Sequence, residues 1–381
     1  ASGPEKIALM VNYMSVLSSA FTILFLFWTL TLLLKKLPFF KTLDSIPDHI
    51  GFFGSAAVGS LSFCFSDSFW FNAVETEVYA MATLILSILF WLGLKWEEEM
   101  NTSRGDRWLL MIAFVIGLSF GVHFMGLLAI PAVGLLYYFK KYDFNLKSFL
   151  LANIISISIL LFIFKLLLPT TLSIFGYVEV FFVNEIGLPF NYGTIFSAII
   201  LILTIYYLLN KSFRENKYML NTITLCVTFI FIGFSSWLMI PIRSNANTVI
   251  NENAPSDARS LLAYYNLEQY PDTYLFRGPM YSDIYSGQDD NEPYKDDKPK
   301  YERDYKKNKY IVVNDWKKGK LNNNKEHVGF FPRMWSSENA VNYLDFTGFL
   351  DFSIKNEYRG QDQLIEIINQ FKSSIDSNDI T

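Results

Sequence analysis

Repeated apolar runs of membrane length are the feature that most restricts how this chain can fold. They occupy residues 7 to 240, and polar residues dominate after that. A soluble domain does not contain repeated apolar runs of about 17 to 25 residues, which is the length a membrane helix needs. We predict an all-α polytopic membrane protein with about eight spans, some short or re-entrant. The runs are residues 7–34, 50–65, 78–94, 108–121, 124–139, 149–168, 195–209 and 220–240.

Basic residues occupy every second loop between these runs. Lys and Arg follow the first, third, fifth and seventh runs, and cytoplasmic loops carry such an excess. The remaining loops contain no Lys or Arg: residues 66–77, 121–123 and 169–193. We therefore expect a multi-pass membrane protein, with these three loops and everything after the last span on the external side.

The segment from Trp108 to Phe139 is too long for one span and short for two. Both of its ends are basic, so the chain must enter the membrane and return, turning at residues 121–123. Two short spans and a re-entrant hairpin both fit this pattern. Gly117 and Gly121 form a small-xxx-small pair, which lets helices pack closely.

The charge pattern divides the chain into two parts. Residues 1–241 are expected to form the helical bundle, and residues 242–381 an external, mixed and partly irregular segment. Within it, residues 289–325 are rich in Lys, Asp and Asn and predict mostly solvated loop, with one strand at residues 310–313. Residues 171–190 are apolar yet contain Glu179 and Glu185, which fits an interfacial segment or an irregular hydrophobic plug.

Three carboxylates lie between the second and third apolar runs, in residues 66–79. Carboxylates this close to hydrocarbon are costly unless they face water, a partner or a substrate. Asn72 with Glu75 three residues later is typical of a helix start in which Asn caps and Glu reaches back. Residues i and i+2 of a helix point about 200° apart, so Glu75 and Glu77 cannot share one face. We expect one to cap and the other, Glu77, to face the bundle interior.

Two cationic or donor side chains are further candidates for a binding site. His123 lies at an external turn, where it could meet a phosphate or a sugar hydroxyl, or be a satisfied polar group. Arg243 follows the last span on the external side, where a lipid-linked phosphate or headgroups could pair with it. His49 and His327 show no metal-ligand spacing, and no basic tract or nucleotide-binding loop occurs. We expect no metal, cofactor or nucleic acid.

Four stretches in register resemble a known family. They are FWFNAVETEVYAMATL, GDRWLLMIAFVIGLSFGVHFMGLLAIPA, IRSNANTVINENAPSDARSLLAYYNLEQY and FFPRMWS, which begin at residues 69, 105, 242 and 330. In order and spacing they are similar to the bacterial relatives of the protein O-mannosyltransferases, membrane glycosyltransferases of the GT-C type. A eukaryotic transmembrane O-mannosyltransferase is a relative of the same family. The family often has Pro at the position of Val249 and a basic residue at that of Leu267.

The resemblance implies a GT-C-like helical bundle that transfers a sugar, typically mannose, from a polyprenyl phosphate. The acceptors are Ser and Thr hydroxyls of exported proteins, so the donor, the acceptor protein and membrane lipids are the expected partners. The resemblance also implies that Glu77 supports catalysis. It further implies that four matched residues, together with the neighbouring Glu75, bind the substrate. The matched residues are Tyr79, His123, Arg243 and Asn245. The catalytic aspartate of the family is expected upstream of Ala1, so this sequence alone is expected to be inactive.

Two other classes of function stay open at this stage. A transporter or flippase of a lipid-linked sugar would have charged residues near the middle of the membrane and repeat symmetry, and neither is evident. A non-catalytic membrane subunit of an export complex would use the long external segment for docking. The sequence does not separate this last reading from the enzyme.

Overall fold

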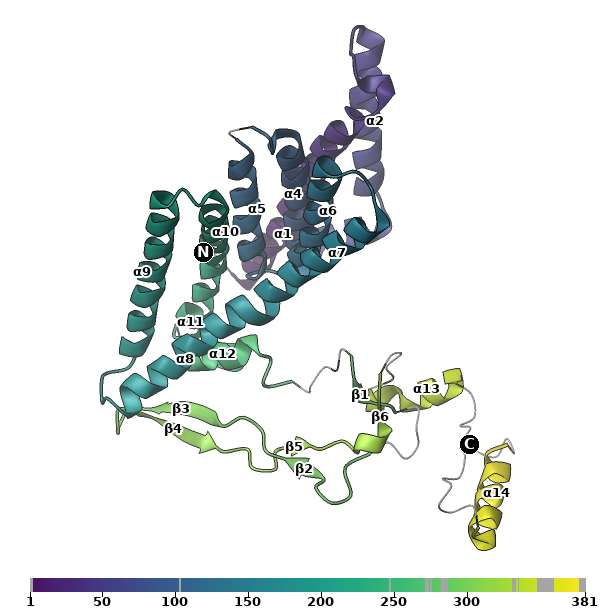
Figure 1. The fold of residues 1–381 in the computed structure, drawn as a ribbon, viewed down its shortest axis with the longest axis vertical. Coiled ribbons are helices and arrows are strands. Elements are labelled where there is room, and N and C mark those ends of the chain that lie inside the picture. Colours follow the sequence, from purple (N-terminus) through teal and green to yellow (C-terminus); the bar gives the residue numbers. More distant parts are fainter. Residues whose placement is uncertain are drawn as a thin grey trace. The chain divides into compact units, whose positions relative to one another are not determined.

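The computed structural model describes most of the chain as two units (Figure 1). One unit comprises Ala1–Leu267 and the other Glu268–Thr381. The described residues are 3–102, 104–246, 248–270, 274, 276–281, 287–330, 334, 336–347 and 360–376. The first unit includes α12, which contacts α8, so it extends beyond the expected bundle limit at residue 241. Residue 241 as the end of the membrane-embedded part stays a prediction.

The first unit is a bundle of helices joined by short connections. Its α-helices are α1 (Pro4–Leu34), α2 (Ile46–Cys64), α3 (Asp67–Val74), α4 (Val78–Glu99), α5 (Gly105–Ser119), α6 (Ala129–Lys141), α7 (Leu146–Leu161), α8 (Leu168–Asn184), α9 (Tyr192–Arg214), α10 (Tyr218–Phe234), α11 (Met239–Ser244) and α12 (Ala258–Tyr265). Shorter turns are η1 (Pro38–Phe40), η2 (Phe124–Leu128), the π-helix η3 (Phe162–Leu167) and η4 (Ser235–Leu238).

The apolar runs form helices, as predicted. Among the described residues, 6 helical segments are long and apolar enough to cross a membrane, or 7 if the bent pair α2 and α3 counts as one span. The expected run 108–121 forms α5, whose 15 residues are short for a span. The following run is η2 and α6, so the chain does turn near residues 121–123.

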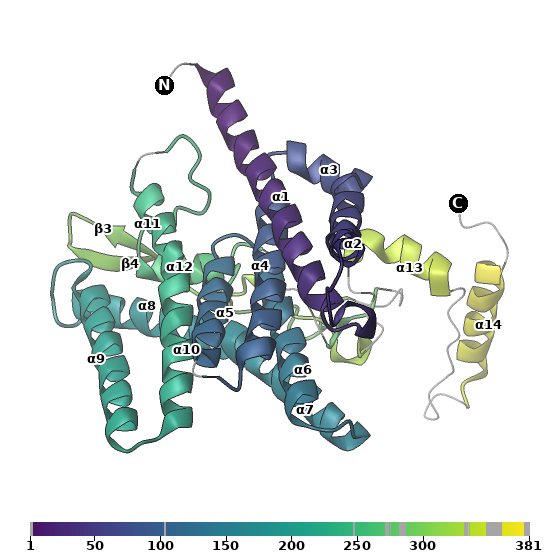
Figure 2. The ribbon, with the colours of Figure 1, turned by 90° about the horizontal axis from the view of Figure 1, so that it is seen from above.

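Helices α1 and α4 lie side by side and run in the same direction (Figures 1 and 2). Near their starts, Thr76 donates a hydrogen bond to Asn12. Farther along, the rings of Trp28 and Trp91 lie 5.8 Å apart. The N-terminal ends of α1 and α4 therefore lie at the same end of the bundle.

Glycines set the close packing of α5 against α10. A Cβ atom added at Gly117 would lie 2.1 Å from the carbonyl oxygen of Ile230, and one at Gly233 would lie 2.2 Å from that of Phe114. Only glycine fits such backbone contacts. The small-residue reading of Gly117 is therefore confirmed. The bond of Tyr218 to Asp106 near the helix starts and that of Trp237 to Phe120 just past their ends show that α5 and α10 run in parallel.

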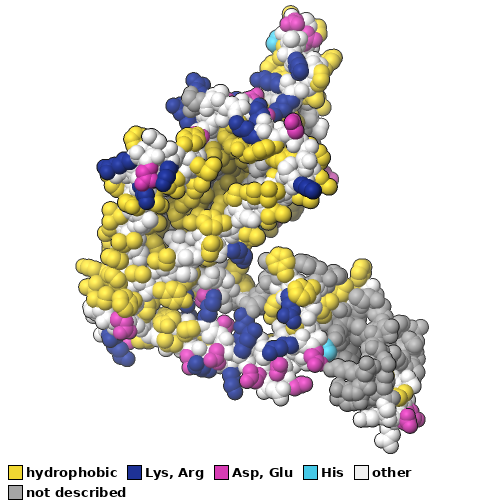
Figure 3. Space-filling model, viewed as in Figure 1, with side chains coloured by type: hydrophobic (Ala, Val, Ile, Leu, Met, Phe, Trp, Pro, Cys, Tyr) yellow, Lys and Arg dark blue, Asp and Glu magenta, His cyan; other side chains and the backbone are white. Residues whose placement is uncertain are grey.

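The loops predicted to be cytoplasmic meet at one end of the bundle, which we call the Glu97 end. Glu97 accepts hydrogen bonds from Lys36 and from Lys140, the latter at 3.4 Å. Tyr218 donates to Asp106 across the α5 and α10 starts. Figure 3 shows Lys and Arg side chains gathered around the α4–α5 and α9–α10 connections. The basic loops thus share one end, whichever side of a membrane it faces.

A helix of 39 residues replaces the external loop expected at 169–193. Helices α7 and α8 join through the π-helix η3 into one long helical segment (Figure 1), and Leu146–Asn184 is apolar on average. Pro169 lies in the first turn of α8, directly after η3, where a missing backbone donor is tolerated. The irregular plug is therefore wrong for residues 171–184. Residence in the membrane interface stays a prediction.

The second unit contains short antiparallel strand pairs and two helices. The described elements are β1 (Gly278–Pro279), β2 (Tyr294–Lys295), β3 (Lys300–Asp304), β4 (Lys309–Asn314), β5 (Lys320–Leu321), β6 (Val328–Gly329), η5 (Lys325–His327), η6 (Ser337–Asn339), α13 (Ala340–Thr347) and α14 (Asp362–Asp376). The pairs are β1 with β6, β2 with β5, and β3 with β4. The strand expected at residues 310–313 lies inside β4, but its partner β3 was not predicted.

Candidate functional site

The acidic stretch is a helix and a three-residue link, not the loop the sequence suggested. Helix α3 ends at Val74, and α4 begins at Val78 with Glu77 as its extended N-cap residue. The Asn72 amide donates to the carbonyl of Ser68 at 2.8 Å, so it does not cap. Neither Glu75 nor Glu77 makes a side-chain cap.

Both glutamates are exposed. The expected split, with one carboxylate capping and Glu77 inside the bundle, is therefore wrong. The link between α3 and α4 is short, and the backbone amide of Glu77 donates to the carbonyl of Glu75 at 2.9 Å. Thr76, which lies between the two glutamates, is hydrogen-bonded to α1, so the backbone that carries both carboxylates is held in place.

Tyr79 and His123 come together at the start of α4. Their ring centroids lie 5.8 Å apart, although the two residues belong to different helical hairpins. Tyr79 is exposed and His123 is half-buried. We call this end of the bundle the His123 end. It includes the α3–α4 link, the turn at residues 121–123 and η4.

The His123 ring is held by the backbone of η2. Its Nδ1 atom accepts a hydrogen bond from the amide of Met125 at 3.1 Å. A neutral imidazole that accepts at Nδ1 carries its proton at Nε2. The ring therefore presents an N–H donor at Nε2, the group that could meet a phosphate or a sugar hydroxyl.

Helix α11 continues from α10 through η4, which packs against the His123 turn. The Trp237 indole donates to the carbonyl of Phe120 at 2.6 Å, and a Cβ atom at Gly121 would lie 2.7 Å from Ser236 Oγ. Arg243, on α11, is exposed, and its guanidinium has no ion-pair or hydrogen-bond partner among the described residues. The sites predicted separately thus occupy one end of the bundle, but no contact joins Arg243 to His123.

Asn245 has a structural partner on each side. Its amide donates to the carbonyls of Pro241 and Ser256, both at 2.8 Å. These bonds connect the end of α11 to the segment before α12. Asn245 therefore shapes the backbone that follows Arg243. Its predicted contact with a substrate stays a prediction.

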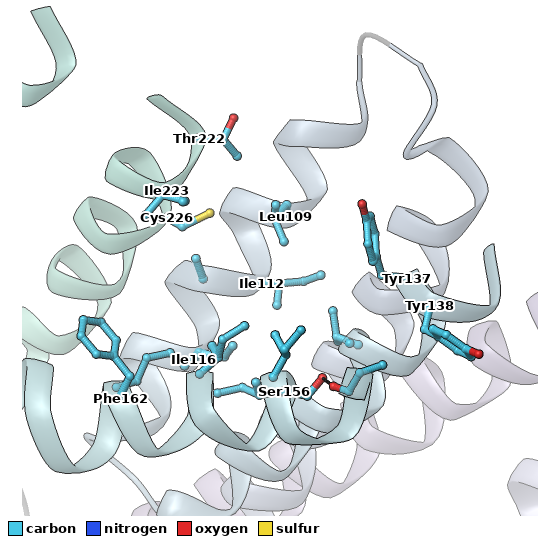
Figure 4. A pocket seen from close by; sticks show the side chains of 18 of the residues that line it. Leu109, Ile112, Ile116, Tyr137, Tyr138, Ser156, Phe162, Thr222, Ile223 and Cys226 are labelled. Atoms are coloured by element: carbon cyan, nitrogen blue, oxygen red, sulfur yellow. Dashed lines mark hydrogen bonds between the residues drawn. The ribbon is translucent and has the colours of Figure 1, made fainter. Parts of the chain in front are cut away.

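The structure contains an apolar groove that sequence reasoning did not predict. It lies between α5, α6, α7 and α10, with a volume of about 750 Å³. Figure 3 shows the hollow lined by hydrophobic side chains, and Figure 4 shows Ile112, Ile116 and Phe162 around it. Polar groups are few, and the Tyr138 hydroxyl there already bonds to Ser148 at 2.7 Å. The groove can hold a long hydrocarbon chain, because such sites are concave and apolar.

Aromatic side chains separate this groove from the His123 end. Phe120 contacts Phe234 at 5.7 Å between ring centroids, and Phe124 contacts Phe164 at 5.2 Å. Trp237 stacks on Phe234 at 5.3 Å. A lipid with its tail in the groove would reach the polar end by passing this cluster. Among the described residues, no group of His, Cys, Asp and Glu is placed to hold a metal ion.

Two family models match the chain. Residues 1–146 match the model described as Protein O-mannosyl-transferase TMEM260 N-terminal domain. The resemblance to protein O-mannosyltransferases is confirmed. Residues 271–367 match a second model, described as a family of unknown function, DUF8416. No curated protein and no solved structure matches the chain significantly.

The O-mannosyltransferase match covers only part of the candidate site. Glu75, Glu77, Tyr79 and His123 all lie within residues 1–146. Arg243 and Asn245 lie outside both matched segments. The stretch that begins at Phe330 falls in the second match, but residues 331–333 and 335 lie outside the described residues. The family match therefore supports a glycosyltransferase-type function for the first part of the candidate site.

Proposed function

We propose that the protein transfers a sugar, mannose by its family, from a polyprenyl phosphate to Ser or Thr hydroxyls of exported proteins. The observation that carries this proposal is the O-mannosyltransferase match over residues 1–146, which contain Tyr79 and His123 in ring contact. The apolar groove supports a lipid-linked donor, because it offers hydrocarbon-lined space open to the bilayer region of the bundle.

The proposed reaction inverts the sugar's anomeric carbon. The acceptor oxygen bonds to that carbon while the bond to the phosphate oxygen breaks, and polyprenyl phosphate leaves. A carboxylate takes the hydroxyl proton. We assign that base to an aspartate outside this sequence and give Glu77 the task of orienting donor, acceptor or a nearby cation. His123 and Arg243 would stabilise the leaving phosphate through N–H donors and positive charge.

Reconstitution tests this function directly. The full-length protein in liposomes, given polyprenyl phosphate mannose and a Ser/Thr-containing acceptor peptide, is expected to glycosylate the peptide. Mass spectrometry of the peptide measures the product. If no member of a panel of polyprenyl phosphate sugars supports transfer, the enzyme proposal fails. Flipping of the donor without its consumption would favour a lipid-linked sugar transporter.

Orientation is a separate part of the proposal: the His123 end faces the periplasm of a bacterial inner membrane. We expect a cysteine at Ser66 to react with an impermeant maleimide in intact spheroplasts, and one at Lys140 to react only after permeabilisation. Cys64 and Cys226 must first be replaced, since they are the only cysteines. Equal labelling of both positions from outside would contradict this topology.

A further inference from the structure

Lys165 is the one basic residue between Lys147 and Lys211, and it interrupts an apolar helix. It lies in the π-helix η3, where α7 passes into α8. Single π-helical turns occur often at functional sites because they re-aim side chains. A charged residue within a membrane helix is costly and typically pairs with another group or marks a ligand pathway. Lys165 therefore needs a physical explanation.

Ring contacts connect Lys165 to the His123 end. Its Nζ atom lies 4.7 Å from the ring centroid of Phe164, and the Phe164 ring lies 5.2 Å from that of Phe124. Phe124 directly follows His123, whose ring contacts Tyr79. Two ring contacts thus connect the lysine to Phe124, the neighbour in sequence of the residue expected to meet the phosphate.

The backbone under Lys165 is fixed from outside the helix. The Tyr265 hydroxyl of α12 donates to the carbonyl of Phe164 at 3.0 Å. Burial raises the pKa of that hydroxyl, so it stays protonated and keeps donating. The wide turn is therefore anchored, and the position of the lysine does not depend on η3 alone.

The Lys165 side chain is exposed, and no carboxylate among the described residues pairs with it. A cation–π contact with Phe164 offsets part of the cost of the charge. Snorkelling to lipid headgroups would do the same. An anionic ligand at the His123 end would offset more of the cost of the charge, because it would supply a full negative charge.

Residues on both sides of Lys165 line the apolar groove. Ile163 and Leu167 contribute to its wall, and so does Phe162, which is labelled in Figure 4. The same short turn thus borders a hydrocarbon-lined space and carries an unpaired cation near His123. A lipid phosphate combines these two chemistries in one molecule.

We propose that Lys165 binds the phosphate of the lipid-linked donor, with the lipid tail in the groove beside η3. This inference rests on the proposed function for the identity of the donor. It adds to the phosphate site a cation that the family motifs did not indicate. Lysine suits the role, since its flexible stem delivers a point charge to a phosphate.

Binding of polyprenyl phosphate, compared with the uncharged polyprenol of equal length, tests this inference without turnover. The wild-type full-length protein is expected to prefer the phosphate at least about tenfold. Lys165→Met should show a clearly smaller preference, limited to what His123 and Arg243 supply, and Lys165→Arg should keep the wild-type preference. Lys147, an exposed lysine in the first turn of the same continuous helical segment, is the matched control position, and Lys147→Met should behave as wild type.

The outcomes separate this inference from the proposed function. A phosphate preference in folded Lys165→Met that equals the wild-type preference overturns the inference, even if sugar transfer occurs. Absence of any preference in the wild type overturns it too. If the preference depends on Lys165 but no sugar is transferred, Lys165 is a phosphate ligand and the enzyme proposal fails. Thermal unfolding of each variant in detergent identifies a fold defect, and Lys165→Gln then replaces Lys165→Met.

Discussion

Glu77→Gln is expected to lower the turnover number for sugar transfer about a hundredfold, because losing a residue that orients the reacting groups can cost about that much. The substitution keeps the size of the side chain and removes its charge. Glu77 is exposed at the N-cap of α4 and makes no side-chain cap, so the helix does not require its carboxylate. Two residues later, Tyr79 contacts the His123 ring. The measurement is the initial rate in liposomes at saturating donor.

Asp67→Asn provides the matched control for that experiment. Asp67 is an exposed carboxylate in the first turn of α3, ten residues from Glu77, and has no assigned contact with substrate. Its neutralisation should leave the turnover number near wild type. Both variants should unfold at similar temperatures. A wild-type rate for Glu77→Gln would remove Glu77 from the site.

The membrane helices were predictable because their signal is physical and local. A run of about 20 apolar residues has few alternatives to a membrane helix. The distribution of Lys and Arg also predicted which loops share an end of the bundle. Ion pairs such as that of Lys36 with Glu97 confirm this grouping within the structure.

The local geometry of the acidic stretch was not predictable from its residues. Asn three positions before Glu is typical of a helix start, but the same Asn amide can donate to a carbonyl one turn earlier. In α3 it does so, to Ser68. The choice between these bonds depends on how α3 packs against α1 and α2, which sequence spacing does not contain.

Glu179 misled the sequence reading for a related reason. A carboxylate in an apolar segment suggested a loop or an interfacial surface. In the structure it is fully buried in α8 and accepts hydrogen bonds from the amides of Asn191 and Thr194, at 2.6 and 2.8 Å. It thereby caps the start of α9 with a side chain from another helix. Such a partner lies outside any local motif.

The groove escaped prediction because four helices build it. Leu109, Ile112, Ala113 and Ile116 follow helical spacing on α5, and that pattern is equally typical of an ordinary core. The groove exists because α5, α6, α7 and α10 are placed so that their apolar faces do not pack against one another. Lys165 was likewise visible in the sequence. The contacts that connect its turn to the His123 end and fix its backbone come from η2 and α12, which are distant in sequence.

Filling the groove tests whether a lipid tail occupies it. Ile155 on α7 lines the groove and is 51% exposed. Ile155→Trp should place a larger ring there and raise the KM for polyprenyl phosphate mannose about tenfold. The turnover number at saturating donor should change little, because the substitution removes tail binding and not the groups near the anomeric carbon. Initial rates over a range of donor concentrations separate the two parameters.

Ile154→Trp is the matched control, because Ile154 is 61% exposed on the same helix but does not line the groove. The two variants add the same side chain at consecutive positions of α7, about 100° apart around the helix, so a general disturbance of α7 or of its contact with lipid should affect both. An equal rise in KM for both would therefore contradict tail binding in the groove. A rise confined to Ile155→Trp, together with a reduced phosphate preference in Lys165→Met, would place the tail and the phosphate on the two sides of η3. The π-helical turn would then act as the divider between hydrocarbon and charge that a lipid-linked donor requires.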